Sequence, residues 1–428
     1  MIVDSLKNAW NVADLRKKIG YTLLMFLIFR IGAHIPIPFI NHEVLKEMFG
    51  SGSMLNFMDT LSGGSFKRLT VFALSITPYI TASIILQLLT IVVPSLERLA
   101  KEGDYGRKKI TQYTRYSTVI LGFVQAFGLT FGIRTALNIP SPAMKWPVYL
   151  LVALVLTAGT AFLMWVGEAI TEKGIGNGIS LIIFAGIVSR VPGAISSLWS
   201  MLRVGEINAF SIIGLIIIVA FITAGVIYVQ EGQRRVSVQY AKRVVGRRVY
   251  GGQSSHIPLK VNQAGVIPVI FAISLLAFPQ TIASWIPTSG FSRFVTTWFS
   301  MNGSITSIPY LLLYGALILF FTYFYTAITF NPIDVAENLK KYGGFIPGLR
   351  PGRPTAEYLS KVLNRITLAG GLFLALIAVL PTLVIGLTGL KNIYFGGTSL
   401  LIVVGVALET MKQIESQLMS RHYQGFMK

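Results

Sequence analysis

Long apolar runs separated by short polar segments make up nearly the whole chain. A helix needs about 20 mostly apolar residues to cross the hydrocarbon core of a membrane. Ten runs reach this length, and they predict membrane spans at roughly 19–38, 70–92, 115–135, 148–168, 177–196, 208–229, 264–286, 307–329, 367–387 and 394–413. The pattern therefore predicts an all-α polytopic membrane protein with ten transmembrane helices.

One segment between the first two predicted spans is only moderately apolar. Residues 55–72 read LNFMDTLSGGSFKRLTVF, and the glycine pair at 63 and 64 interrupts the run. Adjacent glycines disfavour a continuous helix because they leave the backbone flexible. The segment predicts a short helix that does not cross the membrane, and an ordinary external loop is the alternative.

Composition and charge agree with this class and indicate an orientation. The chain is 53% hydrophobic and 13% charged, with a formal net charge of +20 over 428 residues, and its mean hydropathy is +0.65. Of the 37 Lys and Arg residues, 27 lie on the side of the membrane that holds both termini, against nine on the other side. Because cytoplasmic segments carry the excess of Lys and Arg, both termini are predicted to be cytoplasmic.

The two halves of the chain resemble each other. NGISLIIFAGIV at 177–188 matches GGTSLLIVVGVA at 396–407 at five of twelve positions, and TPYI at 77–80 echoes IPVI at 267–270. Chance similarity between apolar helices is the alternative. A repeat of five spans must enter the membrane in the opposite direction the second time, which gives an inverted repeat. The predicted halves are 1–205 and 206–428, with two cytoplasmic loops of the second half at about 230–263 and 330–366.

The sequence offers little support for catalysis. It has no cysteine, its four histidines are scattered, and it has no glycine-rich phosphate-binding motif. We therefore expect a protein that is not an enzyme, with no catalytic residue, no metal site and no cofactor. The centres of the spans are also almost free of ionisable groups, apart from Arg30 in the outer half of the first span. This speaks against an inverted-repeat secondary transporter, which is the main alternative.

Isoleucines at equivalent positions of the repeat suggest a pore. Ile80 corresponds to Ile270 and Ile183 to Ile402, while Ile84 and Ile187 lie one helical turn further on. Six isoleucines from four helices would form an apolar constriction at mid-membrane, and such constrictions stop ions by dewetting. The alternative is that these side chains simply face lipid or the core.

Several stretches together resemble the bacterial SecY family. The resemblance runs along the whole chain and is carried by LSITPYITASIILQLLT (74–90), GEAITEKGIGNGISLIIFAGIV (167–188), YAKRVVGRRVYGGQSSHIPLKVNQAGVIPVIF (240–271), NPIDVAENLKKYGGFIPGLRPGRPT (331–355) and GGTSLLIVVGVALE (396–409). It implies two inverted five-helix halves that form a clamshell around an hourglass pore. Such a channel passes unfolded secretory proteins across the membrane and releases transmembrane segments sideways into the lipid.

The resemblance also implies roles for residues in this numbering. The ring at the waist of the pore would be formed by Ile80, Ile84, Ile183, Ile187, Ile270 and Ile402. A plug helix at about 55–70 would include Leu55, Asp59, Leu61, Gly63, Gly64, Ser65 and Phe66. The lateral gate, which opens between spans two to three and seven to eight and senses the signal sequence, would involve Gln87, Ser274, Phe278 and Ile282.

The basic loops are the expected docking surface for partners. Valines on both sides of GRR in AKRVVGRRVYGG (241–252) predict a protruding hairpin. By resemblance, this loop and the next basic loop dock the SecA motor or the ribosome through Arg243, Arg247, Arg248 and Arg350. The other implied partners are the small subunits SecE and SecG, a polypeptide substrate bearing a signal sequence, membrane lipid, and SecDF and YidC. The implied location is the plasma membrane of a bacterium. The main alternative to docking is a membrane-anchored scaffold whose basic loops bind nucleic acid or lipid.

Overall fold

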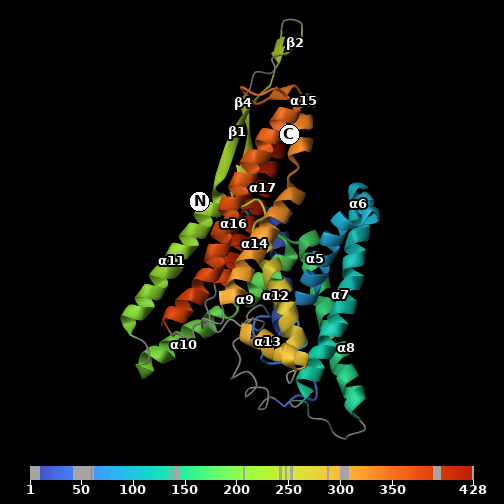
Figure 1. The fold of residues 1–428 in the computed structure, drawn as a ribbon, viewed down its shortest axis with the longest axis vertical. Coiled ribbons are helices and arrows are strands. Elements are labelled where there is room, and N and C mark those ends of the chain that lie inside the picture. Colours follow the sequence, from blue (N-terminus) through green and yellow to red (C-terminus); the bar gives the residue numbers. More distant parts are fainter. Residues whose placement is uncertain are drawn as a thin grey trace.

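Helices make up most of the chain in a computed structural model (Figure 1). The structure describes residues 10–41, 59, 62–134, 137, 144–205, 208–240, 243–245, 248–250, 254–286, 289–298, 308–388 and 397–426. Within these residues, one helix overlaps each of the ten predicted spans, in the same order. These helices are α2 (Ala13–Gly32), α5 (Thr77–Val92), α7 (Asp104–Gly132), α8 (Lys145–Lys173), α9 (Gly178–Val188), α11 (Ala209–Glu231), α12 (Ile267–Trp285), α14 (Ile308–Thr329), α16 (Arg353–Thr388) and α17 (Gly397–Phe426).

Only some of these helices are long and apolar enough to cross a membrane when each is judged alone. Among the described residues, five helical stretches meet that test by length and composition, and a sixth meets it if α5 and α6 (Pro94–Lys101) count as one span bent by 99°. The fifth predicted span is longer than expected, because α9 continues through α10 (Val191–Val204) as a single stretch of 27 residues. The other helices are shorter or carry charged residues toward one end, as α7 and α17 do.

The predicted boundaries of the first two spans are wrong where the first span ends and the second begins. Helix α2 ends at Gly32 and α5 begins at Thr77, so 33–38 and 70–76 are not helical. Instead, the Ile37 N–H donates to the Leu69 carbonyl (3.1 Å) and the Val71 N–H donates to the Ile35 carbonyl (3.1 Å). Prolines at 36 and 38 lack the N–H that a helix needs, and pairing between the two segments satisfies the remaining backbone groups.

The turns at 62–76 are tightly packed against α2 and α8. The Phe72 ring stacks between Phe29 and Phe162, with centroid distances of 6.2 and 6.0 Å. A Cβ added to Gly159 on α8 would run into the carbonyl oxygen of Val71. The glycine therefore lets the helix backbone approach the turn segment directly.

We expect Gly159→Ala to destabilise the protein by about 1–3 kcal/mol, because the added methyl must push α8 away from the turn segment. Gly214→Ala in α11 is the matched control, since nothing lies within 4 Å of its added Cβ. The control should be neutral or stabilising by up to about 1 kcal/mol, since alanine favours helix. Thermal unfolding of both variants in detergent measures the difference. Equal midpoints would contradict the close packing of Gly159 and Val71.

Two groups of helices face each other across the molecule. Figure 1 shows α5, α7 and α8 on one side, α11, α14, α16 and α17 on the other, and α9 and α12 between them. Across this division α5 packs on α12 and α9 packs on α17. The sequence repeat makes α5 equivalent to α12 and α9 equivalent to α17. A two-fold axis brings elements that lie near it against their own counterparts. The packing supports two inverted halves closed as a clamshell.

The two long basic loops join at one end of the helices. Strand β1 (Gln233–Tyr240) pairs antiparallel with both β4 (Ser254–Lys260) and β5 (Gly344–Phe345), so the loops before α12 and α16 share a sheet. Strands β2 (Arg243–Val245) and β3 (Arg248–Tyr250) pair beyond it and extend furthest from the helices (Figure 1). The predicted hairpin is confirmed. Helix α15 (Pro332–Lys341) lies beside this sheet, whereas α13 (Gly290–Trp298) lies at the opposite end of the molecule (Figure 1).

Candidate functional site

Four of the six predicted ring isoleucines line one small cavity. Ile80 (α5), Ile183 (α9), Ile270 (α12) and Ile402 (α17) meet there from both halves of the chain. The cavity has a volume of about 10 Å³, which is about the space that a single water molecule needs. The helices that carry these residues therefore pack closely around the cavity, and the space between the lining side chains is small.

The other two ring isoleucines belong to the same apolar core. Ile84 and Ile187 are buried in the cluster that contains Ile80, Ile183 and Ile402, and Ile270 packs against that cluster. Ile187 also borders a second, larger cavity on the side of α10. The structure thus gathers all six residues in one core, with Ile187 toward one end of it.

The larger cavity measures about 570 Å³ and is lined by parts of the predicted plug segment. Gly63, Gly64 and Asp59 face it from that segment, while Arg30 faces it from α2 and Arg190 from the turn between α9 and α10. Leu55 and Leu61, also assigned to the plug, lie outside the described residues. The described part of this segment therefore lies beside Ile187 of the isoleucine core.

The prediction of a helix in the plug segment is wrong for residues 62–69. Residues 62–69 form successive turns, and Gly63 and Gly64 have φ angles of +66° and +89°. These angles interrupt any right-handed helix, and they suit glycine because it has no Cβ. The buried Ser62 hydroxyl also accepts from the Phe66 N–H (3.1 Å), which stabilises the turn. Ser65 and Phe66 are buried within it.

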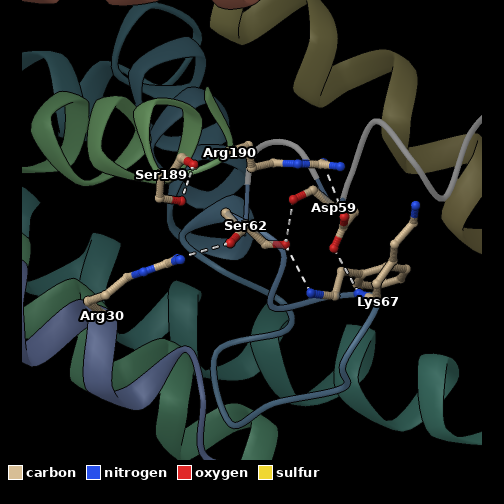
Figure 2. A network of polar contacts seen from close by, with 9 residues as sticks. Arg30, Asp59, Ser62, Lys67, Ser189 and Arg190 are labelled. Carbon is tan, nitrogen blue, oxygen red and sulfur yellow. Dashed lines mark hydrogen bonds and ion pairs between the residues drawn. The ribbon is translucent and has the colours of Figure 1, made fainter. Parts of the chain in front are cut away.

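A buried carboxylate holds this segment together. Asp59 is 1% exposed, and its Oδ2 lies 3.1 Å from Nη1 of Arg190 (Figure 2). Its Oδ1 accepts from the Lys67 N–H (2.8 Å), and its backbone carbonyl accepts from the Gly64 N–H (2.9 Å). No sequence pattern distinguishes Arg190, since an arginine near the end of a span resembles an ordinary interfacial residue.

The predicted gate residues lie along one face of α12 and on α5. Ser274, Phe278 and Ile282 are spaced four residues apart, so they occupy the same face of the helix. Ser274 is buried and lines the small isoleucine cavity, whereas Phe278 is exposed. The Gln87 Oε1 atom on α5 is buried without a hydrogen-bond partner among the described residues. Because α12 packs against both α5 and α7, the expected gate is closed.

The predicted docking residues lie at the basic end. Arg243 and Arg248 belong to the β2–β3 hairpin, and Arg247 lies outside the described residues. Arg350 is exposed, and its carbonyl accepts from the Thr355 hydroxyl (2.9 Å), so this loop is stabilised through its backbone. On α6, a hydrogen bond from Lys101 holds the pKa of the exposed Glu97 carboxyl below its usual range. Among the described residues, no group of three or more acidic or histidine side chains could hold a metal ion.

Comparison with known proteins decides the family. The family model described as SecY matches residues 70–411. The chain belongs to the SecY family. Curated relatives named "Protein translocase subunit SecY" are 50% identical in Halalkalibacterium halodurans and 48% identical in Bacillus subtilis, each over 99% of both chains. One from Thermotoga maritima is 46% identical over 99% of this chain and 97% of the relative.

Solved structures confirm the fold. One described as a protein conducting channel superposes with a TM-score of 0.64 at 21% identity, covering 94% of this chain and 92% of the other. Sec61 in a canine ribosome-channel complex gives 0.62 at 20% identity, with the same coverage. Together with the SecY family match, the fold shows a membrane-embedded subunit of a protein translocase, built as a ten-helix clamshell around a channel. It is not an enzyme.

Proposed function

We propose that the isoleucine core is the constriction of a passive, gated channel for unfolded polypeptides. The observation that carries this proposal is the convergence of Ile80, Ile183, Ile270 and Ile402, from both halves, on one nearly filled cavity. Apolar side chains make no directional hydrogen bonds, so such a ring can seal around a chain of any sequence and still exclude ions. Force must come from a partner, since the sequence contains no nucleotide-binding motif.

Two neighbouring parts complete the proposed gate. The segment at about 55–70 acts as a plug that closes the larger cavity and moves aside when the channel opens. A signal sequence enters between α5 and α7 on one side and α12 and α14 on the other. The positions of Gln87, Ser274, Phe278 and Ile282 on α5 and α12 support a role at this opening.

The proposed orientation and partners follow from charge. Both termini and the basic loops face the cytoplasm of a bacterium, where the hairpin and Arg350 dock the SecA motor or the ribosome. Sec61, a structural neighbour, is described in a ribosome-channel complex, which supports the ribosome as a partner. SecE, SecG, SecDF and YidC are proposed from family resemblance, and exposed apolar helices such as α11 offer room for lipid or small subunits.

The proposed division of the chain falls at residues 205 and 206. Gly205 ends α10 with a left-handed φ of +79°, a conformation that glycine adopts without strain. The link between α10 and α11 would then be the hinge of the clamshell, with one five-span half on either side.

Crosslinking to a trapped substrate tests this function. The chain contains no cysteine, so Ile270→Cys introduces a single thiol. We expect a polypeptide with one cysteine, stalled halfway through the channel, to form a disulfide with Ile270→Cys and with Ile80→Cys. The same substrate should not crosslink to Leu312→Cys on α14, which is 69% exposed on the outer surface of the helices.

The alternatives predict different results. A secondary transporter would instead show solute uptake by vesicles that contain this chain alone. A nucleic-acid-binding scaffold would bind RNA through 241–252 without any motor or ribosome. Either result, combined with no crosslink at Ile80 and Ile270, would contradict the channel.

A further inference from the structure

Three contacts join Asp59 and Gly63 of the plug segment to the residues around them, and Figure 2 shows the polar ones. They add to the hydrogen bond between Ile37 and Leu69. Asp59 forms the ion pair with Arg190, and Arg30 Nη1 donates to the Gly63 carbonyl at 3.4 Å. Gly63 also lies so close to α9 that an added Cβ would be 2.9 Å from the Cα of Gly186. Of these contacts, only the ion pair joins two opposite charges.

The two charges of the pair have different access to water. The Asp59 side chain is 1% exposed, whereas that of Arg190 is 31% exposed and borders the cavity of about 570 Å³. A buried carboxylate is costly unless it is paired and hydrogen-bonded. The Lys67 N–H satisfies one carboxylate oxygen of Asp59, and Arg190 supplies the opposite charge that the buried carboxylate needs.

We propose that the Asp59–Arg190 ion pair determines how readily the channel opens, because it makes the seated plug segment conditional on one electrostatic contact. The inference rests on the proposed plug role of this segment. Removing Arg190 alone leaves an uncompensated buried charge, which favours displacement of the segment into water. Removing both charges eliminates that penalty, so the double variant should stay closer to the native chain than the single one.

The contact therefore acts as a specificity determinant for the signal sequence. With the pair intact, only a substrate that binds the gate strongly displaces the segment. With Arg190 replaced, signal sequences that bind the gate more weakly also displace the segment. Neither Asp59 nor Arg190 needs to touch the substrate for this effect.

Whether the plug segment stays in its buried position can be measured without any transport assay. Ser65 is 0% exposed, so the thiol introduced by Ser65→Cys in the assembled complex reacts with maleimide only when the segment moves. We expect Arg190→Ala to increase the labelling rate at least tenfold. Asp59→Asn combined with Arg190→Ala should bring the rate back to within about threefold of the starting chain. Exchange of the charges, by Asp59→Arg with Arg190→Asp, tests whether the pairing itself matters.

Arg203→Ala is the matched control, because Arg203 lies in α10, the helix that Arg190 precedes as its N-cap, and its guanidinium sits over the Trp199 ring, 5.7 Å from the centroid. It should leave labelling unchanged. Equal labelling in Arg190→Ala and Arg203→Ala would overturn the proposal, as would a double variant that labels as fast as Arg190→Ala. Thermal unfolding midpoints of all variants separate local release of the segment from global unfolding.

Ion conductance and export of a reporter with a defective signal sequence form the second measurement. If Arg190→Ala raises labelling together with conductance and export, the pair controls opening. If labelling rises while both of the others stay unchanged, the pair holds the segment but does not control opening. In that case the segment does not act as a plug. The proposal that channel opening depends on the Asp59–Arg190 ion pair is then also wrong.

Discussion

Replacing Ile402 with asparagine is expected to make the closed channel conduct ions. Ile402 is 1% exposed and lines the cavity of about 10 Å³. An amide placed there without a partner costs about 1–3 kcal/mol, and water entering the constriction relieves that cost. Since 1.4 kcal/mol corresponds to a factor of ten, we expect resting ion conductance to rise about tenfold or more. Currents across planar bilayers containing the complex measure it.

Ile80→Asn should also raise the resting ion conductance, and so should glycine at position 80 or 402. These variants should also export substrates that carry defective signal sequences. Ile402→Leu keeps the volume and apolar character of the side chain, so it should stay near the native conductance. A second control is Ile217→Asn on α11, where the side chain is 62% exposed and remote from the cavity. If conductance and export selectivity of Ile402→Asn remain at the native level, the assignment of the ring is wrong.

Reversing the charge of Arg350 is expected to block export driven by SecA while the membrane complex still assembles. Arg350 is exposed, and its loop is held through its carbonyl rather than its guanidinium, so the substitution should leave the fold intact. The Arg350→Glu variant should lose at least nine-tenths of ATP-dependent transport, because an acidic partner surface would then meet a like charge. Transport of a secretory protein into reconstituted vesicles measures it.

Lys361→Glu reverses a charge at another exposed position, in α16, the helix that follows the loop of Arg350. It should retain most transport if the effect belongs to the loop of Arg350 rather than to total charge. Co-purification of the small subunits with each variant reports assembly. Normal motor-dependent transport by Arg350→Glu would contradict the docking role.

Span prediction succeeded where a helix is apolar along its whole length. The predicted spans at 208–229 and 307–329 agree with α11 and α14 within two residues at each end. The prediction failed at 33–38 and 70–76, which are also mostly apolar. Hydropathy reports that a segment avoids water, whereas the pairing of Ile35 and Ile37 with Leu69 and Val71 depends on two segments meeting in space.

The candidate site, like the spans, could be predicted from the sequence only in part. The repeat made Ile80 equivalent to Ile270 and Ile183 equivalent to Ile402, and all four line one cavity. No sequence pattern linked Asp59 to Arg190, because the two residues are 131 positions apart and each looks ordinary in its own segment. The close approach of Gly63 to Gly186 places the plug segment against α9, and Asp59 lies within contact distance of Arg190, just beyond the end of that helix.

The amino-acid sequence by itself determined the class of the protein, its ten helices, its internal repeat and the isoleucines that converge. Each of these follows from hydrophobic periodicity or from similarity between segments, which are properties of the chain alone. The tertiary structure decided that the isoleucine cavity is closed, that turns replace the expected helix at 62–69, and that a buried ion pair holds that segment. These features depend on close packing between distant segments, and local sequence does not encode such distances.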